Sequence, residues 1–233
     1  MKIAILGYGK MGRMIETIAR ERGHDIVAVK KDAKDDFHFN GAEVAIDFSV
    51  PDAAIENITS CFEQGVPVVS GTTGWLDNYG QVIEKCQEQN GAFIYASNFS
   101  LGVNIFFELN RHLSRLMKDQ KSYTAAIEEI HHVHKLDAPS GTAITLAEDM
   151  IDNLGLKDWS LQPGSDDQLP VTSLREGEVP GTHTVTYTSE VDKISIRHEA
   201  LNRKGFALGA VVAAEWLHDK KGVFTMKDVL NLG

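Results

Sequence analysis

A short glycine-rich segment near the N-terminus constrains the fold of this chain more than any other feature. Residues 2–6 form a run typical of a β-strand that is apolar from Ile3 onward, and Gly7, Gly9 and Gly12 follow directly in G-x-G-x-x-G spacing. Apolar residues then recur at helical spacing up to residue 19. In such a unit the first glycine permits a tight turn, the second lets the backbone approach a pyrophosphate, and the third allows close helix–strand packing. The segment therefore predicts a dinucleotide-binding domain.

The first hundred residues alternate between strand-like and helix-like segments. After the first helix, strands are expected over residues 25–29, 44–48, 66–70 and 92–96, and helices over residues 51–63 and 76–89. Strands that alternate with helices of about 10–15 residues indicate βαβ units and a parallel sheet. We therefore expect an α/β fold with a Rossmann-type, doubly wound parallel sheet that carries helices on both faces.

The pattern changes after residue 98. Helices are expected over residues 102–117 and 142–154, and strands over residues 123–130, 182–188 and 193–199. Residues 158–180 are rich in Pro, Gly, Ser and Asp, which indicates a long loop. This mixture is typical of an α+β domain.

The amphipathic helical pattern returns at residues 205–218, after the last expected strand. Such a pattern is typical of a helix that covers a sheet. We therefore expect a discontinuous dinucleotide-binding domain made of residues 1–101 plus 205–233. The α+β domain, residues 102–204, is expected to be inserted between these two parts and to bind the substrate.

Composition and charge exclude several classes of protein. The net charge of −10 argues against nucleic acid as a partner, because nucleic-acid binding requires a basic face. Cys61 and Cys86 form no CxxC pattern, so neither a zinc site nor a redox site is expected from them. The N-terminus lacks a signal-peptide pattern, and the apolar stretch at residues 208–217 contains Glu215, which favours a core helix over a membrane span. We expect a cytoplasmic protein that binds neither membrane nor nucleic acid.

Several segments are expected at the sheet edge where a dinucleotide binds. A carboxylate normally follows the second strand and binds the adenosine ribose, but Lys30, Lys31 and Asp32 stand there. The lysine pair suits the 2′-phosphate of NADP, while Asp32 could still bind the ribose of NAD; the alternative is a solvated strand end. The candidate cofactor-binding residues are Gly7, Tyr8, Gly9, Lys10, Met11, Gly12, Lys30, Lys31, Gly71, Thr72, Thr73, Ser97, Asn98, Phe99 and Ser100.

A cluster of basic side chains lies in the second half of the chain. His131, His132, His134 and Lys135 fall within five positions, and a Pro-Ser-Gly-Thr turn typical of a helix start follows. Proton-transferring groups beside backbone N–H donors suit a small anionic substrate that is both held and protonated. If residues 129–135 are extended, His131 and Lys135 share one face of the strand. A solvated polar loop and a metal site are the alternatives; no further residues show paired ligand spacing, so no metal is expected.

With these motifs in this order, the chain resembles the 4-hydroxy-tetrahydrodipicolinate reductase family, also called dihydrodipicolinate reductases, of bacterial lysine and diaminopimelate biosynthesis. The resemblance covers nearly the whole chain. It is strongest over residues 129–143, which read Glu-Ile-His-His-Val-His-Lys-Leu-Asp-Ala-Pro-Ser-Gly-Thr-Ala. Supporting matches lie at residues 7–12, 71–73, 97–104 and 181–183. The main departure is Lys31, where many members carry an acidic residue.

The resemblance implies hydride transfer from NADPH or NADH to a cyclic imine dicarboxylate, which forms when 4-hydroxy-tetrahydrodipicolinate loses water. It implies His131 and Lys135 as the catalytic residues that handle the proton, and His132, Gly141 and Thr142 as substrate-binding residues. It also implies a homotetramer built through the sheet of the second domain. The residues themselves agree in part, because N–H groups at a helix start can hold a carboxylate.

The lysine pair predicts a modest preference for NADPH, with NADH still usable. Two other functions stay open on the residues alone: another Rossmann-type NAD(P) dehydrogenase, and a non-catalytic NAD(P)-sensing domain. The arrangement of His131, His132, His134 and Lys135 before the Pro-Ser-Gly-Thr turn argues against the first. A sensing domain would need no proton donors, which argues against the second.

Overall fold

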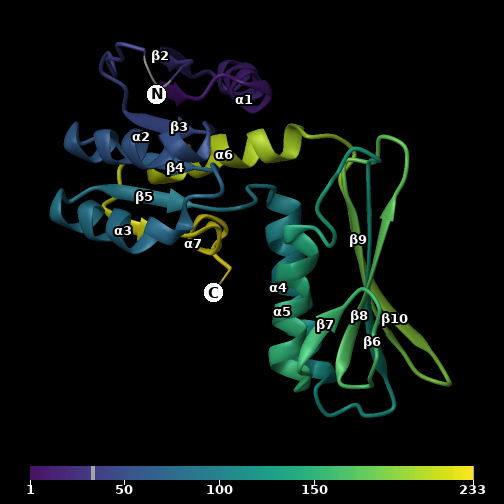
Figure 1. Cartoon of the computed structure of the whole chain (residues 1–233). Coiled ribbons are helices and arrows are strands. Elements are labelled where there is room, and N and C mark those ends of the chain that lie inside the picture. Colours follow the sequence, from purple (N-terminus) through teal and green to yellow (C-terminus); the bar gives the residue numbers. More distant parts are fainter. Residues whose placement is uncertain (33–34, 233) are drawn as a thin grey trace. The chain divides into compact units, whose positions relative to one another are not determined.

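The computed structural model describes residues 1–32 and 35–232, and these form two compact units (Figure 1). The first unit comprises Met1–Leu101 together with Lys204–Gly233, and the second comprises Gly102–Arg203. The chain thus leaves the first unit after Leu101 and returns to it with a C-terminal helix. The sequence pattern predicts the domain boundaries between residues 101 and 102 and between residues 204 and 205.

The first unit is built on a six-stranded sheet with the order β11-β5-β4-β3-β1-β2, in which every pair is parallel. The order reverses at β1, which pairs with both β2 and β3, so the sheet is doubly wound and the expected Rossmann-type fold is confirmed. No strand was expected in the tail that supplies β11. The strands are β1 (Lys2–Leu6), β2 (Asp25–Lys30), β3 (Val44–Asp47), β4 (Val68–Ser70), β5 (Ala92–Tyr95) and β11 (Gly222–Phe224).

Helices cover both faces of this sheet, because side chains along each buried strand alternate between two apolar layers. In β1, Ile3 and Ile5 belong to the layer of α1, α6 and α7, whereas Ala4 and Leu6 belong to the layer of α2 and α3. A short 3-10 helix precedes α3, where one continuous helix was expected. The helices are α1 (Lys10–Glu21), α2 (Pro51–Glu63), η1 (Leu76–Asn78), α3 (Tyr79–Glu88), α6 (Lys204–Leu217) and α7 (Met226–Leu230).

The second unit is a five-stranded mixed sheet with the order β10-β9-β6-β8-β7, and two helices pack on one of its faces (Figure 1). Ile127, Val171 and Val185 from three neighbouring strands meet Leu146 and Met150 from a helix in its core. The elements are α4 (Leu101–Met117), β6 (Thr124–His131), α5 (Gly141–Leu154), β7 (Asp158–Ser160), β8 (Gln168–Arg175), β9 (Thr182–Thr188) and β10 (Lys193–Glu199).

The expectation of a long loop over residues 158–180 is wrong, because β7 and β8 lie there. Leu169 and Val171 alternate into the core, and β8 pairs in parallel with β6. The turn-rich composition indicated a loop, but the hydrogen-bond partners that make β8 a strand come from a distant segment. Within the described residues, no helix is long and apolar enough to cross a membrane.

Candidate active site

The glycine turn between β1 and α1 has the geometry that a bound dinucleotide requires. Gly7 has a φ of +90°, and a Cβ there would lie 2.3 Å from the carbonyl oxygen of Phe48. A Cβ at Gly12 would lie 2.1 Å from the carbonyl oxygen of Gly7. At Gly9, by contrast, a Cβ would meet no atom within 4 Å. The first and third glycines are therefore required by the fold, while the second leaves the start of α1 open to an anion.

A cavity of about 450 Å³ lies beside this turn, at the carboxyl ends of β1, β2 and β3. It brings together five predicted cofactor-binding residues: Gly7, Tyr8, Gly9, Lys30 and Lys31. Asp32 also lines it, together with five residues that were not predicted: Phe48, Ser49, Val50, Ala53 and Asn57. The signal for Phe48–Val50 was present, because they follow the third strand at the same sheet edge as the other candidates.

The other predicted cofactor residues lie outside the lining of this cavity, and their role stays a prediction. Phe99 in particular is a core residue, 1% exposed, whose ring centroid lies 5.8 Å from that of Phe48. A Cβ at Gly209 of α6 would lie 1.7 Å from the Phe99 carbonyl oxygen, so this segment is packed tightly against the helix. The residues outside the lining are Lys10, Met11, Gly12, Gly71, Thr72, Thr73, Ser97, Asn98, Phe99 and Ser100.

Lys30 and Lys31, which form a pair in the sequence, differ in exposure and in partners. Lys30 is 8% exposed, and its Nζ donates a hydrogen bond to Asn57 Oδ1 at 2.9 Å. Lys31 is exposed, with its Nζ 5.7 Å from the centroid of the Tyr8 ring. The guanidinium of Arg13, which was not predicted, lies 4.7 Å from the same ring. Successive β2 side chains alternate in direction, so Lys30 turns inward toward α2 while Lys31 stays at the cavity mouth.

A buried carboxylate, Asp47 at the end of β3, connects the loops beside this cavity. Its Oδ1 accepts hydrogen bonds from Ser49 Oγ at 2.7 Å and Asn57 Nδ2 at 3.1 Å. Its Oδ2 accepts from Ser70 Oγ at 2.8 Å and Thr72 Oγ1 at 2.7 Å. Burial raises the pKa of Asp47, and these four uncharged donors offset the shift only in part. Thr72 is thus engaged in supporting the loops around the cavity.

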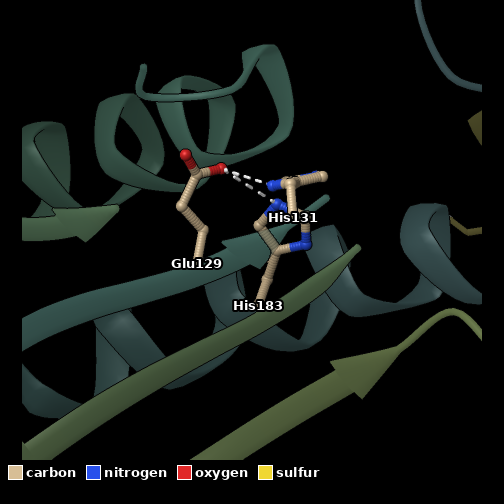
Figure 2. Close-up of side chains that lie close together, drawn as sticks. All are labelled: Glu129, His131 and His183. Atoms are coloured by element: carbon tan, nitrogen blue, oxygen red, sulfur yellow. Dashed lines mark ion pairs between the residues drawn. The ribbon is translucent and has the colours of Figure 1, made fainter. Parts of the chain in front are cut away.

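In the second unit, three buried side chains converge at the ends of β6 and β9 (Figure 2). Oε2 of Glu129 lies 3.2 Å from Nδ1 of His131 and 3.6 Å from Nε2 of His183. Glu129 and His131 are two residues apart in β6, so both side chains point to its helix-covered face. Antiparallel pairing of β6 with β9 places His183 opposite Glu129. His131 was predicted as a site residue, whereas Glu129 and His183 were not assigned a role.

Glu129 is 0% exposed and is held as an ion. Its Oε1 accepts hydrogen bonds from Ser173 Oγ at 2.8 Å and from Arg175 Nη2 at 3.2 Å. The backbone N–H of Ser140 lies 3.1 Å from each carboxylate oxygen. Burial favours the neutral acid, but the nearby rings of His131 and His183 and the donors of Ser140 and Ser173 outweigh it, so the pKa of Glu129 lies well below its usual range.

The predicted anion-binding turn does begin a helix, α5. Ser140 is its N-cap, and Ser140 Oγ accepts the N–H of Ala143 at 3.2 Å. Gly141 and Thr142 form the first helical positions, where N–H groups point out of the helix end. Ser140 Oγ also lies 3.1 Å from Nε2 of His183, so the helix start is joined directly to the buried cluster.

Residues 129–135 are not extended throughout, so the expectation that His131 and Lys135 share a strand face is wrong. β6 ends at His131, and a turn follows in which the N–H of Lys135 donates to the His132 carbonyl at 3.1 Å. Lys135 Nζ lies 2.7 Å from Asp137, and this ion pair lowers the pKa of Asp137. His132 Nε2 lies 3.2 Å from Arg203 Nη2.

Glu129, His131 and His183 also have the atoms to ligate a metal ion, which the sequence did not predict. Their candidate ligand atoms all lie within 4.8 Å of one another. The Arg175 guanidinium already places a positive charge 3.2 Å from the same carboxylate, which opposes a second cation. The donor set therefore suits proton handling better than metal binding.

The comparisons with known proteins cover nearly the whole chain. A family model described as the N-terminus of dihydrodipicolinate reductase matches residues 1–99, and one described as its C-terminus matches residues 102–230. The 4-hydroxy-tetrahydrodipicolinate reductase of Christiangramia forsetii is 58% identical over 99% of this chain and 98% of its own. That of Methanopyrus kandleri is 42% identical over 81% of this chain and 71% of its own.

A solved structure has the same fold. The dipicolinate-bound dihydrodipicolinate reductase from Paenisporosarcina sp. TG-14 superposes with a TM-score of 0.80, at 21% identity, over 97% of both chains. Sequence identity and both family models point to the same group of enzymes. The chain therefore belongs to the dihydrodipicolinate reductase family.

Proposed function

We propose that this oxidoreductase reduces 4-hydroxy-tetrahydrodipicolinate, by way of its dehydrated imine, to tetrahydrodipicolinate with NADPH or NADH. The observation that carries the proposal is the pairing, in one chain, of an open glycine turn with the His131–Lys135 segment beside a helix start. Its relatives, 58% and 42% identical, bear the name of this reductase. The reaction places the protein in lysine and diaminopimelate biosynthesis, in the cytoplasm.

The reaction needs one hydride and one proton, and the two units divide these tasks. A bound nicotinamide would supply the hydride, and Gly9 at the start of α1 would hold its pyrophosphate. Addition of the hydride to the imine produces an enamine-like anion, which takes a proton from His131 or Lys135. At the start of α5, Gly141 and Thr142 hold a substrate carboxylate, and His132 binds the substrate beside them.

The exposed cation at the cavity mouth favours NADPH. Lys31 lines the cavity, and both Lys31 and Arg13 lie near the ring of Tyr8, so both can reach a 2′-phosphate. Lys30 is engaged with Asn57 and supports the cavity wall instead. Asp32 also lines the cavity and can bind the ribose of NADH, so the preference is modest.

Copies of this chain assemble into a homotetramer through the second sheet. Helices α4 and α5 pack on one face of it (Figure 1). Side chains on the other face, such as Glu128, Thr172 and Thr186, are exposed or half-buried. Light scattering of the purified chain tests this assembly: a tetramer mass supports it, and a monomer mass contradicts it.

One coupled assay tests the activity. The condensation product of pyruvate and aspartate semialdehyde is supplied with NADPH or NADH, and oxidation of the nicotinamide is followed. Turnover with this substrate supports the proposal. Binding of the nicotinamide without turnover would identify a sensing domain, and turnover only with a 2-hydroxy acid or an aldehyde would identify a different dehydrogenase.

A further inference from the structure

Glu129 is a fully buried carboxylate directed at the ring of His131, and the proposed reaction gives it no task. We propose that Glu129 is a positioning residue, which keeps the proton of neutral His131 on Nδ1 and so leaves Nε2 to exchange a proton with the substrate. The catalytic consequence rests on the proposed function. The position of the proton on His131 is independent of the proposed function, because it is a property of the protein without substrate.

The carboxylate can act in this way because its neighbours hold it in one orientation and one charge state. Ser173 and Arg175 donate to Oε1, and Ser140 N–H lies within 3.1 Å of both oxygens. These donors leave Oε2 turned toward His131 and keep the group ionised. An ionised carboxylate only accepts hydrogen bonds, so a proton shared with Nδ1 must come from the ring.

The contact between Glu129 and His131 is short but not yet aligned. Nδ1 lies 3.2 Å from Oε2, yet it makes no hydrogen bond of good geometry. Catalytic pairs are often misaligned before substrate binds and tighten in the complex. A rotation of the ring that directs its Nδ1–H at the carboxylate would complete this hydrogen bond.

His183 does not compete for this carboxylate as a second cation. Burial lowers the pKa of His183 more than Glu129 raises it, so the ring is neutral at physiological pH. Ser140 Oγ lies 3.1 Å from His183 Nε2 and already accepts the N–H of Ala143, so its hydroxyl proton can be donated to His183. The charge of Glu129 is therefore available to His131.

The proposed tautomer makes the proton transfer balance. Protonated His131 gives the proton on Nε2 to the carbon of the enamine-like anion, so an N–H bond breaks and a C–H bond forms. The ring left behind is neutral and keeps its proton on Nδ1, facing Glu129. Its free Nε2 can then take up the next proton from solvent. In the opposite tautomer Nε2 would still carry a proton, and only Nδ1, beside Glu129, could take up another.

The tautomer can be read directly by nitrogen NMR of the full chain labelled with ¹⁵N-histidine, with His131→Gln used to assign the signals. With the ring neutral, we expect the Nδ1 of His131 to be protonated and Nε2 to be bare. In Glu129→Gln the amide oxygen can keep the contacts with Ser140, Ser173 and Arg175, which turns the amide N–H₂ toward His131. The tautomer should then reverse, and kcat should fall by roughly 10²–10⁴-fold with little change in either KM.

Glu148→Gln is the matched control. Glu148 is exposed on α5 of the same unit and belongs neither to the proposed site nor to the proposed sheet interface, so the same change of charge should leave tautomer and kcat unchanged. Glu129→Asp keeps the negative charge, but its shorter side chain places the carboxylate farther from His131. It should retain the wild-type tautomer and lose less activity than Glu129→Gln. Folding of each variant is checked by thermal unfolding and by nicotinamide binding.

Three results would overturn the proposal. The first is wild-type neutral His131 with its proton on Nε2, which needs no variant and decides the matter even if Glu129→Gln fails to fold. The second is a folded Glu129→Gln variant with the wild-type tautomer, whatever its activity. The third is a stoichiometric metal whose removal shifts the His131 signals. If wild type shows the expected tautomer but does not turn over the substrate, only the proposed function fails.

Discussion

Each unit of the molecule buries one carboxylate completely, Asp47 in the first and Glu129 in the second, yet folding moves their pKa values in opposite directions. Burial favours the neutral acid at both sites. Around Asp47 all four donors are uncharged side chains, whereas Glu129 has an arginine, two histidines and a backbone N–H within reach. The set of donors around each carboxylate therefore decides the outcome, and burial alone does not.

The two networks also differ in what they support. Asp47 connects Ser49, Ser70 and Thr72 at the ends of neighbouring strands, so it shapes the wall of the proposed cofactor cavity. Glu129 faces a histidine that can transfer a proton and is joined to the start of α5 through Ser140. The first network organises binding and the second organises chemistry, and this division can be tested.

Loss of a proposed proton donor should have the largest effect. We expect His131→Gln or Lys135→Ala to lower kcat by roughly 10²–10⁴-fold, the usual range for a lost general acid. Nicotinamide affinity, measured by fluorescence titration, should be nearly unchanged, because both residues lie in the second unit. A variant with wild-type kcat would show that its residue is not the proton donor. A variant that loses nicotinamide affinity instead would contradict the division between the two units.

The pH dependence of unfolding should separate the two carboxylates. Folding lowers the pKa of Glu129, so its ionised form stabilises the protein above its ordinary value of 4.5, and this contribution is lost as the pH falls below that value. Folding raises the pKa of Asp47, so its contribution is present below its ordinary value of 3.8 and is lost as the pH rises through the raised value.

Urea unfolding, followed by tryptophan fluorescence between about pH 3 and pH 6, measures both contributions. As the pH falls, the stability of wild type relative to Glu129→Gln should decrease, and its stability relative to Asp47→Asn should increase. Glu148→Gln is again the control, with no such trend expected. If both differences move in the same direction, the contrast between the two networks does not hold.

The smallest effect concerns cofactor choice in the first unit. Lys31 is exposed, so solvent screening limits its attraction for a 2′-phosphate, and we expect wild type to prefer NADPH by roughly 10-fold or less. Lys31→Glu should raise KM for NADPH and leave KM for NADH equal or lower. Lys85→Glu, the same charge change on α3, should alter neither the KM for NADPH nor the KM for NADH. A wild type that prefers NADH 10-fold or more, with a Lys31→Glu variant that behaves identically, would identify Lys31 as a solvated strand end.

Much of the first unit could be predicted from sequence because its signals are local. The glycine spacing, the apolar runs of the buried strands and the helical periodicity of α1 each arise within about 20 residues. The same reasoning failed where a neighbour decides the structure. β8 looks like a loop in composition and becomes a strand only through its pairing with β6. The direction of Lys30 depended on Asn57 of α2 in the same way.

The candidate site shows the same limit. Sequence by itself determined the family, the order of the motifs and the basic segment around His131, because these depend on residue identity and short spacing. Only the tertiary structure decided that His131 faces Glu129. The register of β6 with β9 places His183 opposite Glu129, and its register with β8 places Ser173 there. Strand register is set by hydrogen bonds and packing between distant segments, so no local pattern could have revealed this cluster.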